Sequence, residues 1–274
     1  MPVLYRLRPS LGTLVSVHCR ADDARIARTA VEAAFAAIDR VHRLMHPSRA
    51  GSDLLAIRDI GVGGVDIDGW TWAVLRAAAQ LHLESNGLFD PCVGDCSGTL
   101  NELRLVEPNR AETTRPLALD LGGIAKGFAV DRAIDALREF GCSAGEVNAG
   151  GDLRVFGAAA SEIWIRADQA CRPIGLRDEA CAVSDASAIA RPPEHRGYRR
   201  YDSVNGRIDL ARAAAVVAPS ALWADALATY AVVCRTPAEH RRLDAVLALH
   251  DARRVDADPD WPKKSPAARA GLIG

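Results

Sequence analysis

A glycine-rich segment at residues 120–131, DLGGIAKGFAVD, constrains the fold of this chain more than any other stretch. Alternating apolar residues just before it, at 117–121, predict a short strand, and the residues after its two glycines have helical spacing. A strand that enters a glycine turn before a helix brings backbone N–H groups and the positive end of the helix dipole to one place, which suits an anion. Lys126 would add a full positive charge there. A Gly-Gly pair is also a common tight connection, so the segment alone leaves both interpretations open.

The overall charge of the chain limits the kinds of partner it can have. Its 274 residues, 49% of them hydrophobic, are enough for a substantial core. With 34 basic and 35 acidic residues, the formal net charge is -1. This balance gives no overall attraction to nucleic acid or to anionic membranes. We therefore expect a small-molecule or protein partner and no nucleic acid.

The sequence contains neither a signal-peptide pattern nor an apolar run of about 18 residues that could span a membrane. We therefore expect neither export nor membrane insertion. The seven cysteines are odd in number and include no C-x-x-C pair, which fits reduced thiols in the cytoplasm. The one close pair, Cys92 and Cys96, lacks the second pair of a zinc site, so packing explains it better.

The spacing of apolar residues predicts a succession of helices and strands. Strands are predicted at residues 14–18, 117–121, 153–156, 162–166, 181–184 and 213–218. Helices are predicted at residues 22–43, 68–87, 125–140 and 220–235, the last with Ser220 as N-cap, and residues 241–250 form one more helix or strand. Because there is no repeat and no linker, we predict a single α+β domain at residues 1–250, with a mixed β-sheet packed with helices, and a weakly ordered tail at residues 251–274.

Asp225 and Thr229 lie four residues apart in a predicted helix, so both oxygens project from one face. A carboxylate and a hydroxyl suit a hard cation such as Mg²⁺. The same spacing is common on solvated helix faces. Here apolar neighbours such as Trp223 and Leu227 favour a partly enclosed site.

Two other segments could approach a ligand. Residues 148–152, NAGGD, place two glycines between predicted strands, although taken alone they are better explained by a plain β-turn. Residues 89–91, FDP, could likewise be only an Asx turn made rigid by proline. The chain has no H-E-x-x-H, no G-x-S-x-G and no G-x-x-x-x-G-K-[ST] motif, so the common zinc-protease, hydrolase and P-loop functions have no support.

Taken in chain order, these segments resemble the ApbE-type FAD:protein FMN transferase family. The matching segments are residues 11–13 (LGT), 44–45 (LM), 52–54 (SDL), 89–94 (FDPCVG), 120–131, 148–152, 218–219 (AP) and 224–229 (ADALAT). They extend from residue 11 to about residue 234. The resemblance implies the α+β fold of that family for this part of the chain.

The resemblance also implies an activity and a site. Family members bind FAD with Mg²⁺ and move its FMN half onto a threonine or serine hydroxyl of a target protein, with release of AMP. By position, the resemblance implies Mg²⁺ bound by Asp225, Thr229 and the main-chain oxygen of Gly123. The residues that it implies at the FAD site are Leu11, Ser48, Phe89, Asp90, Asp120, Gly122, Lys126, Gly127 and Asp202.

The chain departs from the family pattern where a general base is expected. The family segment H-x-x-D-P-x-T-G corresponds to residues 199–206, RRYDSVNG, which places Arg199 at the histidine position. Arginine cannot serve as a base because its pKa lies above about 12. His195, Asp202 or water could remove the proton instead, so the catalytic residue stays unassigned. Leu11 replaces a methionine and Ser48 replaces a common aromatic residue, both where the family holds the flavin ring.

Three functions are therefore consistent with the sequence. The first is FMN transfer to an acceptor protein whose identity the sequence does not give. The second is a Mg²⁺-dependent FAD pyrophosphatase that yields FMN and AMP, and the third is a non-catalytic FAD-binding homologue. Loss of the histidine argues against the first, whereas retention of Asp225, Thr229, Gly123 and Lys126 argues against the third. We rank transfer first because it is the dominant activity of the family.

Overall fold

The computed structural model describes residues 1–93, 98–167, 170–185 and 213–255. Its largest sheet has seven strands, and every pairing between neighbours is antiparallel. The order is β1 (Val3–Ser10), β2 (Thr13–Arg20), β6 (Ala144–Ala149), β7 (Asp152–Phe156), β10 (Ala180–Asp185), β11 (Ala213–Ala218) and β12 (Arg253–Arg254). The α+β class is confirmed. The strand directions differ from the expected mixed sheet, because tight hairpins join β1 to β2 and β6 to β7 and the other described neighbours also run in opposite directions.

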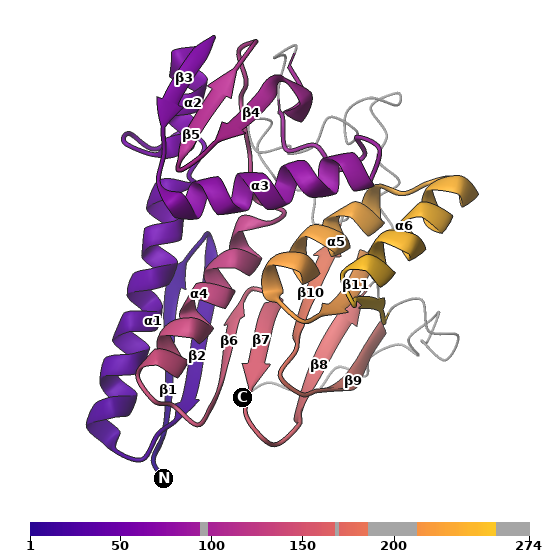
Figure 1. The fold of residues 1–274 in the computed structure, drawn as a ribbon. Helices are drawn as coiled ribbons and strands as arrows, with labels where there is room; N and C mark the ends of the chain where they lie inside the picture. Colours follow the sequence, from indigo (N-terminus) through magenta and orange to yellow (C-terminus); the bar gives the residue numbers. More distant parts are fainter. Residues whose placement is uncertain (94–97, 168–169, 186–212, 256–274) are drawn as a thin grey trace.

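Helices cover one face of this sheet (Figure 1). The described helices are α1 (Ala24–Leu44), α2 (Asp53–Ile60), α3 (Gly69–Glu84), α4 (Ala125–Glu139), α5 (Ala221–Val233) and α6 (Pro237–Leu249). α1 packs beside α4, and α4 packs beside α5, which lies over β10 and β11. Almost all of α5 is buried, as expected for a helix that is apolar on every side. The main core lies between these helices and the sheet.

A β-hairpin covers part of the opposite face of the sheet. It consists of β8 (Ser161–Ala167) and β9 (Ala170–Leu176). Ile163 and Ile165 of this hairpin join a second apolar cluster with Leu153, Val155 and Val217 of the large sheet. Strands β7, β10 and β11 are therefore covered on both faces in this part of the sheet.

A smaller unit lies between α1 and α4 in the sequence. It contains α2, α3, the 3-10 turn η1 (Leu100–Glu102) and a three-stranded antiparallel sheet of β3 (Gly63–Asp66), β5 (Arg110–Thr113) and β4 (Leu103–Val106). In Figure 1, α3 crosses between this small sheet and the large layer. The end of α3 contacts α6, because Arg242 donates to the Glu84 carbonyl at 2.9 Å.

Most of the predicted elements are present. The four predicted helices are confirmed, Ser220 caps α5 by accepting the Trp223 N–H at 3.3 Å, and residues 241–249 of the segment left open as helix or strand belong to α6. The predicted strand at 117–121 is wrong. Among the described residues only Leu119 pairs, in an isolated bridge with Cys92, and on the Pro91 side the ladder has no N–H with which to continue.

The predicted boundary near residue 250 stays a prediction. Arg253 and Arg254 of the expected tail form β12, which pairs with Val216 and Val217 of β11. Residues 256–274 lie outside the described part of the chain.

Candidate functional site

The start of α4 is built by a turn at residues 120–124. Asp120 Oδ1 accepts the Gly122 N–H at 2.8 Å, and the Leu121 carbonyl accepts the N–H groups of Ile124 and Ala125 at 3.0 and 2.8 Å. The N-cap residue Ile124 makes no side-chain cap. A helix N-terminus therefore follows the two glycines, as predicted, although no regular strand precedes them.

Asp225 of α5 lies 98 residues beyond Gly127 in the sequence and caps this helix N-terminus. Its Oδ2 accepts the Gly127 N–H at 3.0 Å, and the residue is 2% exposed. A Cβ on Gly127 would lie 2.0 Å from the carbonyl oxygen of Ala221. Only glycine therefore permits the two helices to approach this closely. Gly127, which the family resemblance implies at the FAD site, is buried at this crossing.

The Gly127 N–H is the donor that would otherwise continue the α4 ladder back to Gly123. Because Asp225 accepts it, no backbone hydrogen bond among the described residues ends on the Gly123 carbonyl. Gly123 is buried in the turn before α4. A carbonyl in this position remains able to bind a cation.

Thr229 lies one turn after Asp225 on α5 and is 5% exposed. Its hydroxyl is 3.1 Å from the hydroxyl of Ser184 on β10, with either oxygen able to donate. The predicted pair of oxygens is therefore buried rather than on a solvated helix face. The Ser184 hydroxyl therefore lies beside the Thr229 hydroxyl and adds another side-chain oxygen there.

Lys126 forms an ion pair with Asp152, the first residue of β7. Asp152 is 1% exposed, whereas 27% of the Lys126 side chain is exposed. Lys126 therefore places a positive charge at the start of α4, and a buried carboxylate lies against it. The ion pair links the start of α4 to the turn at residues 148–152.

Two hairpin tips lie side by side next to this ion pair. The β1–β2 turn has positive φ at both Leu11 and Gly12, which matches the twist of a tight hairpin. The β6–β7 turn has Gly150 and Gly151, also with positive φ. A Cβ on Gly150 would lie 2.5 Å from Thr13 Oγ1, so the two tips are in close contact. Leu11 is thereby placed near the end of the sheet from which Asp152 reaches Lys126.

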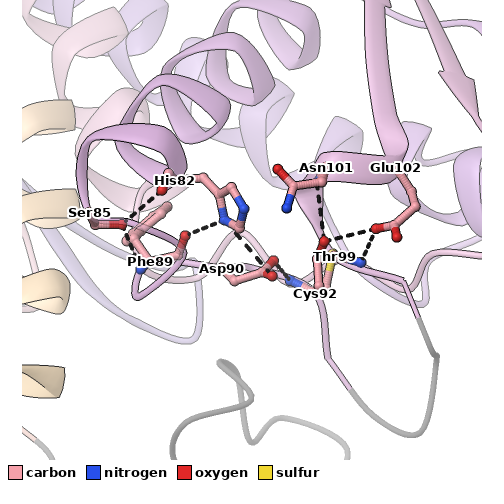
Figure 2. Close-up of polar contacts among 8 residues, drawn as sticks. All are labelled: His82, Ser85, Phe89, Asp90, Cys92, Thr99, Asn101 and Glu102. Carbon is pink, nitrogen blue, oxygen red and sulfur yellow. Dashed lines mark hydrogen bonds and ion pairs between the residues drawn. The ribbon is translucent and has the colours of Figure 1, made fainter.

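The loop that contains Phe89 and Asp90 is fixed by a network around His82 of α3 (Figure 2). The Phe89 carbonyl lies 2.9 Å from His82 Nδ1, which must carry the hydrogen because a carbonyl only accepts. The Phe89 N–H donates to Ser85 Oγ at 3.0 Å. Asp90 Oδ1 accepts the Cys92 N–H at 3.0 Å, which is the Asx turn considered from the sequence.

The same loop is joined to the glycine segment. The Val93 N–H donates to the Ala118 carbonyl and the Asp120 N–H donates to the Pro91 carbonyl, each at 2.9 Å. Asp90 and Asp120 are thus brought to adjacent loops by the backbone. These contacts unite two segments that are about 30 residues apart in sequence.

Of the remaining expected site residues, only Ser48 is among those that the structure describes. Ser48 is exposed in the turn after α1, where its N–H donates to His46 Nδ1 at 3.2 Å. Arg199, Asp202 and His195 lie outside the described residues. The structure therefore tests neither the degenerate segment at 199–206 nor His195 and Asp202 as alternative bases.

Sequence reasoning missed two residues that organise the site, Asp131 and Arg154. Asp131 lies on the buried side of α4 and forms an ion pair with Arg154 of β7 at 2.6 Å. A charged residue at a core-facing position between Phe128 and Ile134 was the available signal, because an unpaired carboxylate is rarely buried.

A model of the ApbE family matches residues 11–102 and 97–248 of this chain. The chain belongs to the ApbE family. The match spans the glycine segment, the Phe89–Asp90 loop and the helix that carries Asp225 and Thr229.

Individual ApbE relatives agree with this assignment. A curated protein of Treponema pallidum (strain Nichols), named FAD:protein FMN transferase, is 25% identical over 318 residues, covering 96% of this chain and 86% of the relative. The fold is shared with the ApbE protein of Thermotoga maritima, with TM-score 0.75, 22% identity and coverage of 91% of this chain and 92% of that one. It is also shared with the flavinyl transferase ApbE of Pseudomonas stutzeri in its apo form, with TM-score 0.76, 20% identity and 89% coverage of each chain.

Two kinds of feature are absent from the described residues. No group of three or more His, Cys, Asp or Glu side chains among them is placed to hold a metal ion. No helix in the described ranges is both long and apolar enough to cross a bilayer.

Proposed function

We propose that this ApbE protein transfers FMN from FAD to a threonine or serine hydroxyl of a target protein in a Mg²⁺-dependent reaction that releases AMP. The observation that carries the proposal is the buried pair of oxygen-bearing side chains on α5, Asp225 and Thr229, of which Asp225 accepts the Gly127 N–H at the start of α4. The name of the Treponema pallidum relative and the family match support the same activity.

The chemistry of these donors fits Mg²⁺. Magnesium prefers oxygen ligands and usually keeps several waters, so one carboxylate, one hydroxyl and one carbonyl form a suitable partial set. Asp225 can accept the Gly127 N–H and still bind a cation, because a carboxylate offers about four lone-pair sites. A set with a single carboxylate also agrees with the lack of a His, Cys, Asp or Glu cluster among the described residues.

In the proposed reaction, the acceptor hydroxyl oxygen forms a bond to the phosphorus of the FMN half, and the bond from that phosphorus to the AMP oxygen breaks. The hydroxyl proton leaves to a base or to water, and AMP carries away the electron pair. When bound, Mg²⁺ neutralises charge on the pyrophosphate. Lys126 and the N-terminus of α4 would bind the same phosphates, and Asp90 and Asp120 would orient the nucleotide from adjacent loops.

Hydrolysis is the second candidate, and one sequence observation favours it. Arg199 stands where the family has a histidine, and arginine cannot accept the hydroxyl proton. Water would then replace the acceptor hydroxyl, giving free FMN and AMP. A protein that binds FAD without turnover is the third candidate.

One experiment separates the three candidates. Purified protein is incubated with FAD, Mg²⁺ and a candidate acceptor protein, and both AMP and flavin fluorescence of the protein bands are measured. AMP with a fluorescent acceptor band supports transfer, and AMP with free FMN and no band supports hydrolysis. FAD binding without release of AMP, in the presence of either Mg²⁺ or Mn²⁺, would support the third candidate, a protein that binds FAD without turnover. An Arg199→His variant with faster transfer than wild type would support the assignment of residues 199–206.

We also propose that the protein works in the cytoplasm. Cys19, Cys92, Cys142, Cys181 and Cys234 are free and buried. Burial raises the pKa of Cys19 and Cys181 to about 12, so both stay as thiols. Reduced thiols are typical of that compartment, and the location stays a prediction.

A further inference from the structure

Asp131 is a buried carboxylate that the proposed chemistry does not use. It lies in the second turn of α4 and is 4% exposed. Its Oδ1 accepts the Ala221 N–H at 2.9 Å and the Arg154 guanidinium at 2.6 Å, and its Oδ2 accepts the Leu222 N–H at 2.9 Å. Ala221 and Leu222 are the first two residues of α5. Asp131 therefore caps the start of a helix that lies 90 residues away in sequence.

Asp225 makes the reciprocal contact, because it caps the start of α4 at Gly127. Each helix thus places one carboxylate at the positive end of the other, where a negative charge is stabilised. The Asp131 and Asp225 contacts lie at different positions along the two helices. Together they restrain α5 from sliding along α4 and from rotating against it. The close approach at Gly127 and Ala221 lies between them.

The two carboxylates nevertheless differ in what they can do. Asp131 accepts three donors, one of them a guanidinium that compensates its charge, so it is poorly suited to bind a cation. Ser220 independently caps α5 through the Trp223 N–H. The helix itself would therefore persist without Asp131, whereas its position against α4 would depend on fewer contacts.

We infer that Asp131, supported by Arg154, is a positioning residue that sets the place of Asp225 and Thr229 relative to the start of α4. The inference rests on the proposed function. Asp225 lies one helical turn beyond Ala221, so a shift of the α5 start moves the carboxylate directly. A metal ligand set that spans two helices loses affinity when their relative position is loosened.

The test uses the full chain with an Asp131→Asn variant and an Arg154→Met variant. Mn²⁺ binding is measured by electron paramagnetic resonance with and without FAD, and AMP release from FAD is measured over a range of Mg²⁺ concentrations. We expect Mn²⁺ to bind about 10- to 100-fold more weakly to Asp131→Asn, the loss typical when a support of a metal ligand is removed. Saturating Mg²⁺ should restore kcat, because the ligands themselves are intact.

Asp135→Asn is the matched control, because Asp135 is on the same helix in an ion pair with Arg132 on a more exposed face. It should bind Mn²⁺ as wild type does. Wild-type Mn²⁺ affinity in both test variants, or a loss of kcat that Mg²⁺ does not restore, would overturn the inference while the proposed function stands. If the Asp131→Asn variant does not fold, Mn²⁺ binding and AMP release by the Arg154→Met variant test the inference instead. Wild-type protein that binds no Mn²⁺ and releases no AMP would overturn both proposals.

Discussion

Asp225 on α5 accepts the backbone N–H of Gly127 on α4 at 3.0 Å. This hydrogen bond joins the two segments that carry the proposed metal ligands, and it gives Asp225 a structural role besides the proposed chemical one. A carboxylate has enough acceptor capacity for both. The two roles can be separated by substitution.

Asp225→Asn should keep the fold and lose the metal function. Asparagine retains an acceptor oxygen for the Gly127 N–H but carries no negative charge for a cation. We expect thermal stability close to that of wild type and at least a tenfold loss in apparent Mg²⁺ affinity, about the effect of removing one ligand support. Thermal unfolding and AMP release at increasing Mg²⁺ measure the two effects.

Asp225→Ala is the comparison for that variant. It should lose the Mg²⁺ dependence and, in addition, about 1 kcal/mol of stability, because the start of α4 loses its cap. Magnesium-dependent turnover equal to wild type in either variant would contradict the assignment of Asp225 as a ligand.

Gly127→Ala should destabilise the protein although alanine favours a helix. The helix propensity gain is about 1 kcal/mol, but the new Cβ would lie 2.0 Å from the Ala221 carbonyl oxygen, a backbone atom that cannot turn aside. Overpacking against backbone should outweigh that gain and leave a net loss of about 2 kcal/mol. Urea unfolding measures the change.

Gly175→Ala controls for the glycine substitution itself. A Cβ there meets no heavy atom within 4 Å, and Gly175 has no positive φ. Its stability should stay within about 0.5 kcal/mol of wild type. An equal effect at both positions would remove the argument that Gly127 is required by the helix crossing.

The helices could be predicted from the sequence because their signals are local. α5 follows Ser220, a good N-cap, and α4 follows a glycine turn, so periodicity and capping agree. The spacing of Asp225 and Thr229 is also local. Their burial and their relation to Gly127 are not, because they depend on how two helices distant in sequence cross.

The errors have physical causes of the same kind. Residues 117–121 alternate like a strand, but Pro91, next to the described bridge at Cys92, has no N–H to extend a ladder on that side. Strand β1 was not predicted, and its large apolar residues Val3, Tyr5 and Leu7 are exposed on the sheet rather than packed in the core. Asp131 was treated as part of a motif, whereas its partners come from α5 and β7.

The ion pair of Lys126 and Asp152 should separate stability from FAD binding. Lys126→Met removes the ion-pair partner of a buried carboxylate and should cost about 2 kcal/mol, less than the usual 3–5 kcal/mol because Lys126 is partly exposed. Adding Asp152→Asn should recover most of that stability, since the carboxylate charge is then gone. FAD affinity should stay low in both, because the cation is absent.

Urea unfolding and quenching of flavin fluorescence measure these two quantities. Asp152→Asn alone keeps the lysine and should bind FAD at least as well as wild type. If Lys126→Met is as stable as the double variant, the two side chains are not coupled. If Lys126→Met binds FAD as wild type does, Lys126 is not a phosphate contact.

Glu146→Gln should stabilise the protein at neutral pH and not in acid. Burial on β6 is the main cause that raises the pKa of Glu146, with His18 acting in the opposite direction. A raised folded-state pKa means that the folded protein holds the proton more tightly, so stability falls as pH rises from the unfolded pKa of about 4.3 through the folded pKa. Glutamine cannot ionise, so its advantage of at most about 1 kcal/mol should appear above that window and vanish below pH ~4. Thermal unfolding at pH 4 and pH 7 tests this, and an equal effect at both values would contradict it.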